Sequence, residues 1–201
     1  MMKDWSNYQS RTYNDEVCPL LIEFLDNYNV NDAIDLGCGS GNESVYMSKR
    51  GIRVLSIDRQ LNKDFILNRL NDNEKKNVSF LESSFENVEL PKTDLLIAFF
   101  SIPFCNPKDF DTLWDKIYNS INDNGYFVGQ LFGDRDAWNE VDSINTFSIE
   151  KVKDYLKLYE VITLKEIEYV RERDNKKWHY FDIIAQKRKW WYEHNRSKKS
   201  F

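Results

Sequence analysis

Short apolar runs alternate with amphipathic segments along most of this chain. The apolar runs predict strands at 33–35, 53–58, 78–81, 94–99 and 126–132. The segments between and around them predict helices at 15–28, 43–49, 63–70, 110–121 and 148–158. Strands that are linked by helices form a mostly parallel sheet with helices on both faces.

The C-terminal part has a different pattern. Two strand-like runs, 161–170 and 178–185, flank the polar segment 171–177. This arrangement predicts an antiparallel hairpin rather than another helical crossover. The predicted fold class is therefore α/β, with a doubly wound, seven-stranded, mostly parallel sheet that has one antiparallel strand in a C-terminal hairpin. Ligands of such sheets bind beyond the carboxyl ends of the parallel strands. If the first hairpin strand runs parallel to the others, the hairpin turn lies at that same edge.

Composition predicts one domain and a distinct tail. The 201 residues are 41% hydrophobic and 15% aromatic, which is enough for one sizeable core. We assign residues 1–186 to this domain. The chain carries a net charge of −5, but its last sixteen residues hold six Lys or Arg against one Glu. Residues 187–201 are therefore interpreted as a basic, flexible tail that could contact RNA, a membrane surface or a partner.

No apolar run approaches the roughly 20 residues that a membrane span requires. The first residues also lack the apolar centre of a signal peptide, so a cytoplasmic location is expected. Cys18, Cys38 and Cys105 follow no disulfide or metal-ligand spacing, and we expect free thiols and no metal site. Nothing in the sequence predicts an oligomeric state.

A glycine-rich turn follows the first predicted strand. The apolar run ends at Asp35, and Gly37, Gly39 and Gly41 come next. A dinucleotide fingerprint would need a third glycine at Asn42, and Glu43 places a negative charge where a helix would otherwise favour a phosphate. The loop therefore favours a neutral or cationic ligand over a pyrophosphate. A tight connection without any ligand is the alternative interpretation.

The second predicted strand ends in Asp58, where a carboxylate can accept hydrogen bonds from ribose hydroxyls. An acid at this point is otherwise a turn former or a helix cap. Together, the glycine loop and Asp58 predict a nucleoside pocket.

The segment Asp35-Leu-Gly37-Cys-Gly39-Ser-Gly41, followed by Asp58, resembles the class I methyltransferases that use S-adenosylmethionine. The segments after the fourth and fifth strands are similar to a bacterial branch related to tellurite-resistance methyltransferases. The resemblance implies the Rossmann-like methyltransferase fold and S-adenosylmethionine as cofactor. It also implies that the cofactor contacts Asp35, Gly37, Cys38, Gly39, Gly41, Asp58, Arg59, Ser84, Phe85 and Phe99. Ser84 departs from the acid that the family usually has beside adenine.

The expected chemistry is in-line attack of an acceptor on the sulfonium methyl group. Candidates for a catalytic base are His179, Asp134 and Asp136. Each has a structural alternative, because Asp134-Arg135-Asp136 could be a salt-bridged turn and His179 a packed strand residue. Aromatic residues are candidates for a lid and an acceptor pocket, namely Trp5, Tyr8, Phe100, Phe104 and Trp138.

A small-molecule methyltransferase is the leading hypothesis. The alternatives are methylation of RNA or protein, which the basic tail would favour, and a noncatalytic S-adenosylmethionine-binding module. The chain outside its basic tail is acidic, which disfavours broad contact with nucleic acid. Methylation of RNA therefore depends on the tail. The segment Ser101-Ile-Pro-Phe104 resembles the motif of nucleic-acid amino methyltransferases, but Ile102 departs from it. Asn42 disfavours a nicotinamide oxidoreductase. The sequence does not identify the methyl acceptor.

Overall fold

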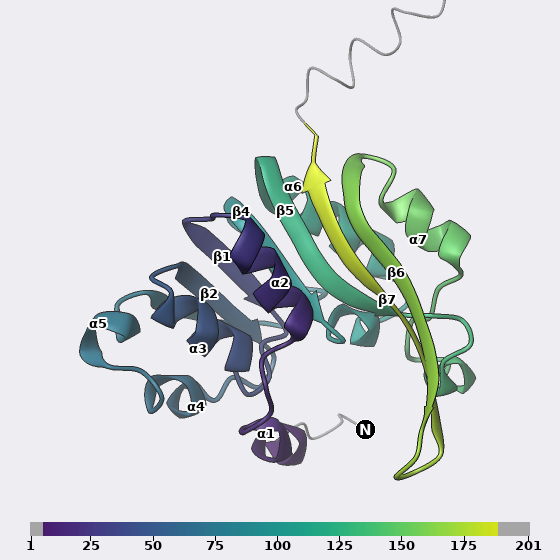
Figure 1. Cartoon of the computed structure of the whole chain (residues 1–201), viewed down its shortest axis with the longest axis horizontal. Coiled ribbons are helices and arrows are strands. Elements are labelled where there is room, and N and C mark those ends of the chain that lie inside the picture. Colours follow the sequence, from purple (N-terminus) through teal and green to yellow (C-terminus); the bar gives the residue numbers. More distant parts are fainter. Residues whose placement is uncertain (1–5, 189–201) are drawn as a thin grey trace, which may run out of the picture.

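The computed structural model describes residues 6–188, except for the side chains of Ser6 and Tyr8. Seven strands form one sheet in the order β3-β2-β1-β4-β5-β7-β6 (Figure 1). Their bounds are β1 Asp32–Leu36, β2 Arg53–Asp58, β3 Val78–Glu82, β4 Thr93–Phe99, β5 Ile121–Phe132, β6 Tyr159–Arg171 and β7 Lys176–Lys187. Only β7 runs against its neighbours, since it pairs antiparallel with both β5 and β6. The predicted fold class is confirmed.

The helices are α1 Ser6–Thr12, α2 Pro19–Asn27, α3 Asn42–Lys49, α4 Lys63–Leu67, α5 Asp72–Lys75, α6 Phe110–Ser120 and α7 Ile149–Tyr155. Two short 3-10 helices, η1 Ile102–Phe104 and η2 Ala137–Glu140, follow β4 and β5. In Figure 1, α2 and α3 cover one face of the sheet, and α6 lies behind it. No described helix has both the length and the apolarity to cross a bilayer.

Several predicted boundaries move for identifiable reasons. The helix predicted at 15–28 begins only at Pro19, because proline disfavours helical backbone in the residue before it and suits the first helical turn. The helix predicted at 63–70 ends at Leu67, and α5 follows with a reciprocal capping box between Asn71 and Glu74. β5 begins at Ile121, five residues earlier than predicted, because an irregular stretch pairs with Thr93.

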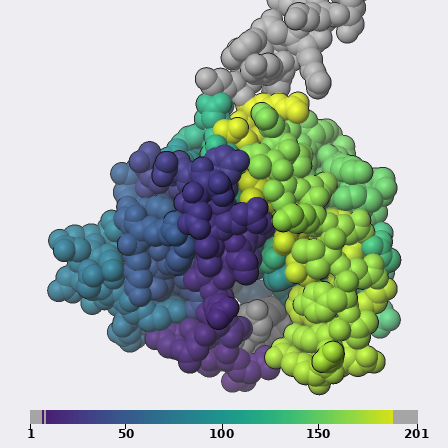
Figure 2. Space-filling view, in the orientation of Figure 1, coloured from purple at the N-terminus to yellow at the C-terminus, as the bar shows by residue number. Residues whose placement is uncertain are grey.

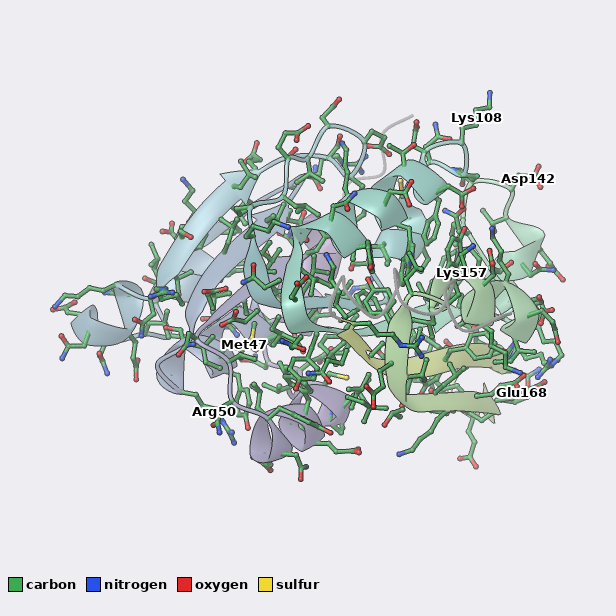
Figure 3. All side chains as sticks on the ribbon, turned by 90° about the horizontal axis from the view of Figure 1, so that it is seen from above. Met47, Arg50, Lys108, Asp142, Lys157 and Glu168 are labelled. Carbon is green, nitrogen blue, oxygen red and sulfur yellow. The ribbon has the colours of Figure 1, made fainter. Side chains whose placement is uncertain are left out.

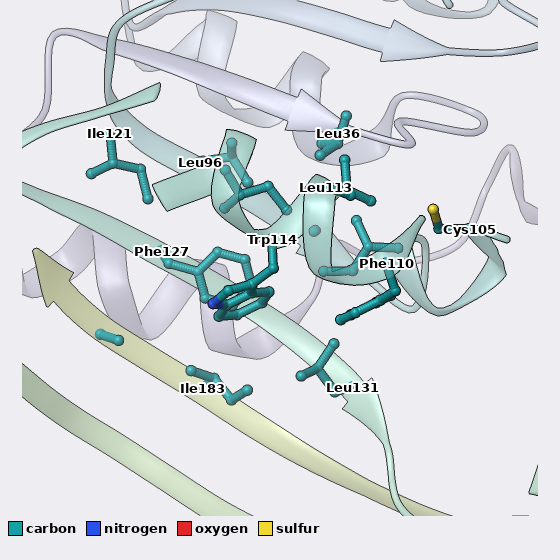
Figure 4. Close-up of a cluster of buried hydrophobic side chains, with 14 of the residues drawn as sticks. Leu36, Leu96, Cys105, Phe110, Leu113, Trp114, Ile121, Phe127, Leu131 and Ile183 are labelled. Atoms are coloured by element: carbon teal, nitrogen blue, oxygen red, sulfur yellow. The ribbon is translucent and has the colours of Figure 1, made fainter. Parts of the chain in front are cut away.

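The larger part of the core lies between the sheet and the helices α6 and α7 (Figure 4). Trp114 of α6 is 5% exposed, and its indole nitrogen donates to the Tyr155 carbonyl of α7 at 3.1 Å. Its ring meets Phe127 of β5 edge to face, with centroids 5.0 Å apart. This packing joins both helices to the middle of the sheet.

A second core cluster lies on the opposite face, under α2 and α3. Leu21 and Phe24 of α2 are fully buried there, as is Met47 of α3. In Figure 3, Met47 lies inside the molecule, whereas Lys108 and Asp142 extend outward at the periphery. α2 thus rests on the centre of the sheet, and β7 and β6 lie to one side of it (Figure 1).

The hairpin turn between β6 and β7 lies at the carboxyl edge of the parallel strands. β6 is antiparallel to β7, and β7 is antiparallel to β5, so β6 runs in the same direction as β5. The turn therefore extends past the same edge as the glycine loop, as the sequence predicted for a parallel first strand.

Lys187, which the sequence assigns to the tail, is the last residue of β7. Its side chain is buried, and the ammonium donates to the carbonyls of Tyr118 and Ile121 at 2.8 and 2.9 Å. The ordered strand thus extends one residue past the predicted boundary. Apart from Lys187 and Arg188, the tail lies outside the described residues.

Candidate active site

The glycine loop between β1 and α3 is tied to the end of β2 by main-chain hydrogen bonds. The N–H groups of Gly37 and Cys38 both donate to the Ile57 carbonyl, at 2.8 and 2.9 Å. The N–H of Gly39 donates to the Asp58 carboxylate at 2.9 Å. The two sequence motifs therefore form one structural unit at the carboxyl edge of the sheet.

Each of the three glycines has a left-handed φ, between 54° and 82°, but their surroundings differ. A Cβ on Gly37 would lie 2.4 Å from the Ser101 Cβ, and one on Gly41 would lie 2.2 Å from the Ile66 side chain. A Cβ on Gly39 would meet no described atom within 4 Å. Gly37 and Gly41 are therefore required by packing, whereas Gly39 presents bare main chain to open space, where a ligand can approach.

Asp58 is half-buried at the tip of β2 and accepts one hydrogen bond on each oxygen. Gly39 donates to Oδ2, and the Gln60 N–H donates to Oδ1 at 2.9 Å. Each carboxylate oxygen can accept a further hydrogen bond, which leaves capacity for the two hydroxyls of a ribose. Arg59, the next residue, is exposed.

Two carboxyl groups lie beneath the loop, of which Asp35 is buried and Glu43 is half-buried. Asp35 is 4% exposed and accepts a hydrogen bond from the Ser44 hydroxyl at 2.6 Å. Burial, followed by repulsion from Glu43, raises the pKa of Asp35 to about 8. Burial also raises the pKa of Glu43, whose carboxylate accepts from the Cys18 N–H. A cationic ligand nearby would favour the ionised form of both groups.

Cys38 is buried within the loop. Burial, together with the nearby acids Asp35 and Asp58, raises the pKa of its thiol well above the ordinary value. A thiol that stays protonated is a poor nucleophile, so Cys38 contributes to the loop through its main chain.

The residues predicted beside adenine lie after β3. Phe85 packs against Gly37, since its ring edge would lie 3.2 Å from a Cβ there. The Ser84 hydroxyl accepts from the Asn87 amide at 3.2 Å. Phe99, the last residue of β4, is half-buried and packs against the cluster under α2. The structure thus brings Phe85 to the glycine loop, and it places Phe99 at the adjoining strand end.

An unpredicted network connects α1 to the glycine loop. The Asn42 amide donates to the Thr12 carbonyl at 2.8 Å, and the Arg69 guanidinium donates to the carbonyls of Tyr13 and Ser40. Arg69 also lies over the Tyr13 ring, 4.6 Å from its centroid. The N-terminal segment is therefore held close to the loop. Trp5 and the Tyr8 side chain, predicted as part of a lid, lie outside the described residues.

His179 is completely buried, and both of its ring nitrogens have partners. Nδ1 accepts from the Arg135 N–H at 3.0 Å, which assigns the proton to Nε2, 2.9 Å from the Glu166 carboxylate. The ring also packs on Gly133, where a Cβ would lie 2.1 Å from Nδ1. These contacts give His179 the role of holding the turn after β5, which the sequence analysis weighed as the alternative to catalysis.

Asp134 and Asp136 belong to the same turn. Asp136 accepts from the N–H groups of His179 and Trp138, both at 2.9 Å, and its side chain is fully buried. Asp134 is exposed and lies 3.6 Å from both Arg135 and His179. Neither carboxylate faces the glycine loop through any described contact, so the geometry favours the salt-bridged turn over a catalytic role.

Aromatic rings from three strand ends gather beside the loop after β4. We call this set the aromatic cluster: Phe100, Phe104, Phe132, Trp138, Trp178 and Tyr180. Phe100 lies 5.3 Å from Phe132 and 5.0 Å from Tyr180, measured between centroids. Its φ of 47° is rare for a residue with a side chain, and such backbone is concentrated at functional sites. Phe100, Phe104 and Trp138, which the sequence assigned to the acceptor pocket, are thus brought together.

Sequence analysis placed the hairpin turn and His179 at this edge but did not single out Lys176, Tyr180 or Asp182 of β7. Lys176 places its ammonium 4.0 Å from the centroid of Trp178 and 4.5 Å from that of Trp138. Tyr180, two positions beyond Trp178, also belongs to the cluster, and the Asp182 side chain pairs with that of Gln130. The alternation of side chains along β7 is visible in the sequence, but its register against β5 is not.

Residues 33–125 match a family described as a methyltransferase domain. No curated protein sequence matches the chain. Among solved structures, the chain is similar to TehB from Haemophilus influenzae, with a TM-score of 0.74 and 23% identity over 92% of this chain and 68% of TehB.

Two further structures share the fold. The 1,6-didemethyltoxoflavin-N1-methyltransferase of Burkholderia thailandensis, with bound 1,6-didemethyltoxoflavin and S-adenosylhomocysteine, has a TM-score of 0.67 and 15% identity, covering 94% of this chain and 92% of that one. The N-methyltransferase NodS of Bradyrhizobium japonicum WM9, in complex with S-adenosylhomocysteine, has a TM-score of 0.68 and 14% identity, covering 93% of this chain and 100% of that one.

Residues 33–125 therefore match a methyltransferase domain, and the described chain as a whole has the fold of these solved methyltransferases. The individual contacts that we assign to the cofactor remain predictions.

The first prediction compares two glycines. Gly39 and Gly51 both have positive φ, and a Cβ on either would meet no described atom within 4 Å. Alanine at either position should cost about 1 kcal/mol of stability through backbone strain alone. Only Gly39→Ala should also weaken the binding of S-adenosylhomocysteine, by ~10-fold or more, because its methyl group would occupy ligand space. Calorimetry on both variants measures this, and equal affinities would show that Gly39 does not face the cofactor.

The second prediction concerns pH. The pKa of Asp35 is raised in the folded protein, so the fold retains a proton that the unfolded chain releases from about pH 4 upward. Stability should therefore fall as pH rises from about 4 to about 8, by no more than about 1.4 kcal/mol per pH unit, and then level off. Asp35→Asn should reduce this slope by the Asp35 contribution, leaving that of Glu43, whereas Glu82→Gln, at an exposed strand end, should retain the full slope. Urea unfolding at several pH values measures the difference, and parallel curves for wild type and Asp35→Asn would refute it.

Proposed function

We propose that this chain is a methyltransferase that uses S-adenosylmethionine and acts on a small-molecule acceptor. The observation that carries the proposal is the position of the aromatic cluster, which borders the loop after β4. That loop packs directly on the glycine loop, because the Ser101 hydroxyl donates to the Leu36 carbonyl at 2.6 Å. An apolar, ring-lined region beside the cofactor suits a small organic acceptor.

The residues of the glycine loop fit S-adenosylmethionine on three counts. Gly39 leaves open space, and Asp58 has hydrogen-bonding capacity for ribose. Asp35 and Glu43, one buried and one half-buried, supply carboxyl groups that a cation would complement. We assign adenosine to Gly37, Gly39 and Asp58, with Phe85 as an apolar wall. When bound, the cofactor supplies a methyl group on a positively charged sulfur.

The protein's contribution to the reaction is positioning. The hydrogen bonds from Gly37, Cys38 and Gly39 to the end of β2 fix the loop before any ligand binds, so little reorganisation is needed on binding. The aromatic cluster excludes water from the side on which the acceptor would approach. Alignment of the acceptor with the methyl group can then provide a large part of the rate.

Transfer of a labelled methyl group tests the proposal. Wild-type protein should move label from S-adenosylmethionine to at least one member of a panel of amines, thiols, phenols and metalloid oxyanions. Label found only in RNA or protein would contradict it and would favour the alternative that the basic tail suggests. Protein truncated after residue 188 serves as the matched control, since small-molecule transfer should not need the tail.

A further inference from the structure

Alternate residues of β7 form a stripe on the face of the sheet that α2 partly covers. The stripe consists of Lys176, Trp178, Tyr180 and Asp182, and it continues to Ile184, which packs in the cluster under α2. His179 lies on the opposite face because neighbouring side chains of a strand alternate. The stripe, and not His179, is therefore the part of β7 that faces the same side as α2.

Asp182 lies in a row of residues that crosses the sheet at the end of β4. Phe99 is in register with Gln130 of β5, and Gln130 is in register with Asp182 of β7. Adjacent strands lie about 4.8 Å apart, so Asp182 is roughly 10 Å from the strand end that adjoins the glycine loop. A small acceptor can span this distance.

Gln130 fixes the Asp182 carboxylate. Its amide nitrogen donates to Asp182 Oδ1 at 2.7 Å. The Gln130 residue is 7% exposed, whereas Asp182 is half-buried. Among the described residues, no hydrogen bond has Asp182 Oδ2 or the Gln130 side-chain oxygen Oε1 as its acceptor. The pair therefore offers two hydrogen-bond acceptors and no free carboxylate rotation.

The surface is hollowed between α2 and the β6–β7 hairpin, as Figure 2 shows between the purple and yellow-green segments. Four charged or titratable groups face Asp182: Glu23 of α2, Lys165 of β6, Tyr180 of β7, and Cys18, which precedes α2. Burial is the largest influence and raises the pKa of Asp182; the hydrogen bond from Gln130 and the charge of Lys165 oppose it, and Glu23 adds to it. A carboxylate in this setting accepts a proton more readily than an exposed one.

We propose that Asp182 and Gln130 bind the acceptor through an N–H group, and that Asp182 takes the proton of the nitrogen that is methylated. The inference rests on the proposed small-molecule function and narrows it to a nitrogen nucleophile. Two acceptor atoms fit a primary amine or an amino-substituted ring, because such a group donates two hydrogen bonds. A hydroxyl or thiol has only one hydrogen to donate.

The step balances as follows. The nitrogen lone pair forms a bond to the methyl carbon, and the carbon–sulfur bond breaks with its electron pair remaining on sulfur. The sulfonium becomes a neutral thioether, and the positive charge moves to the methylated nitrogen. The N–H proton then passes to the Asp182 carboxylate, which leaves a neutral methylated amine and a carboxylic acid. Solvent takes this proton before the next turnover.

The test uses a panel of primary amines, aminoheterocycles, thiols and phenols with labelled S-adenosylmethionine. Wild type should methylate a nitrogen acceptor, and Asp182→Asn should lower kcat for it by about 10²- to 10⁴-fold. The affinity of this variant for S-adenosylhomocysteine, measured by calorimetry, should stay within about twofold, which reports that the protein is folded. Wild type should lose kcat/KM at low pH as Asp182 is protonated, and this fall should be absent in the variant.

Asp94→Asn is the matched control. Asp94 also accepts from a side-chain amide on the neighbouring strand, since Asn122 donates to it at 3.0 Å, but this pair lies at the amino edge of β4. Asp94→Asn should retain kcat. Equal kcat in Asp182→Asn and wild type, or transfer to thiols or phenols alone, overturns the inference while the small-molecule function stands. No transfer to any small molecule overturns the proposed function and the inference together.

Discussion

The hydrogen bond from the Gly39 main chain to the Asp58 carboxylate is the interaction on which the site depends. It joins the loop after β1 to the tip of β2, and two further N–H groups on the same loop converge on the Ile57 carbonyl. Because parallel strands end at one edge, this link places bare main chain and a carboxylate side by side. Neighbouring side chains pack so closely on Gly37 and Gly41 that neither position has room for a Cβ, and this packing holds the loop in one conformation.

The charges around the glycine loop favour a cationic ligand over an anionic one. Asp35 of β1, Glu43 of α3 and Asp58 of β2 lie around the glycine loop, and burial raises the pKa of the first two. Without a ligand, this concentration of acids is unfavourable, because buried carboxylates repel one another and lose hydration. A sulfonium and an ammonium would relieve it. The same acids would repel a pyrophosphate, in agreement with the absence of a glycine at Asn42.

The sequence predicted the fold well, because the order of strands and helices follows from apolar runs, and because helix-linked strands must be parallel. It also identified the glycine loop and Asp58, whose roles depend on local backbone and on strand ends. It did not predict α1, nor the early start of β5, because both depend on tertiary contacts. Of the three suggested catalytic residues, Asp134 and Asp136 lie in the turn after β5 and His179 lies on β7 against that turn, and all three have partners within the protein.

Register explains why Asp182 was overlooked. Side chains of a strand alternate between faces, so His179 and Asp182, three residues apart, point to opposite sides of the sheet. Nothing in the sequence reveals which set faces α2, because that depends on the pairing of β7 with β5. The Gln130–Asp182 contact spans 52 positions in the chain, and only the folded sheet brings the two side chains together.

The most direct measurement is a crystal structure of the protein with S-adenosylhomocysteine. It should place the adenosine against Gly39, with both ribose hydroxyls within hydrogen-bonding distance of the Asp58 carboxylate. A nucleoside bound elsewhere, with Gly39 covered by protein, would contradict the account.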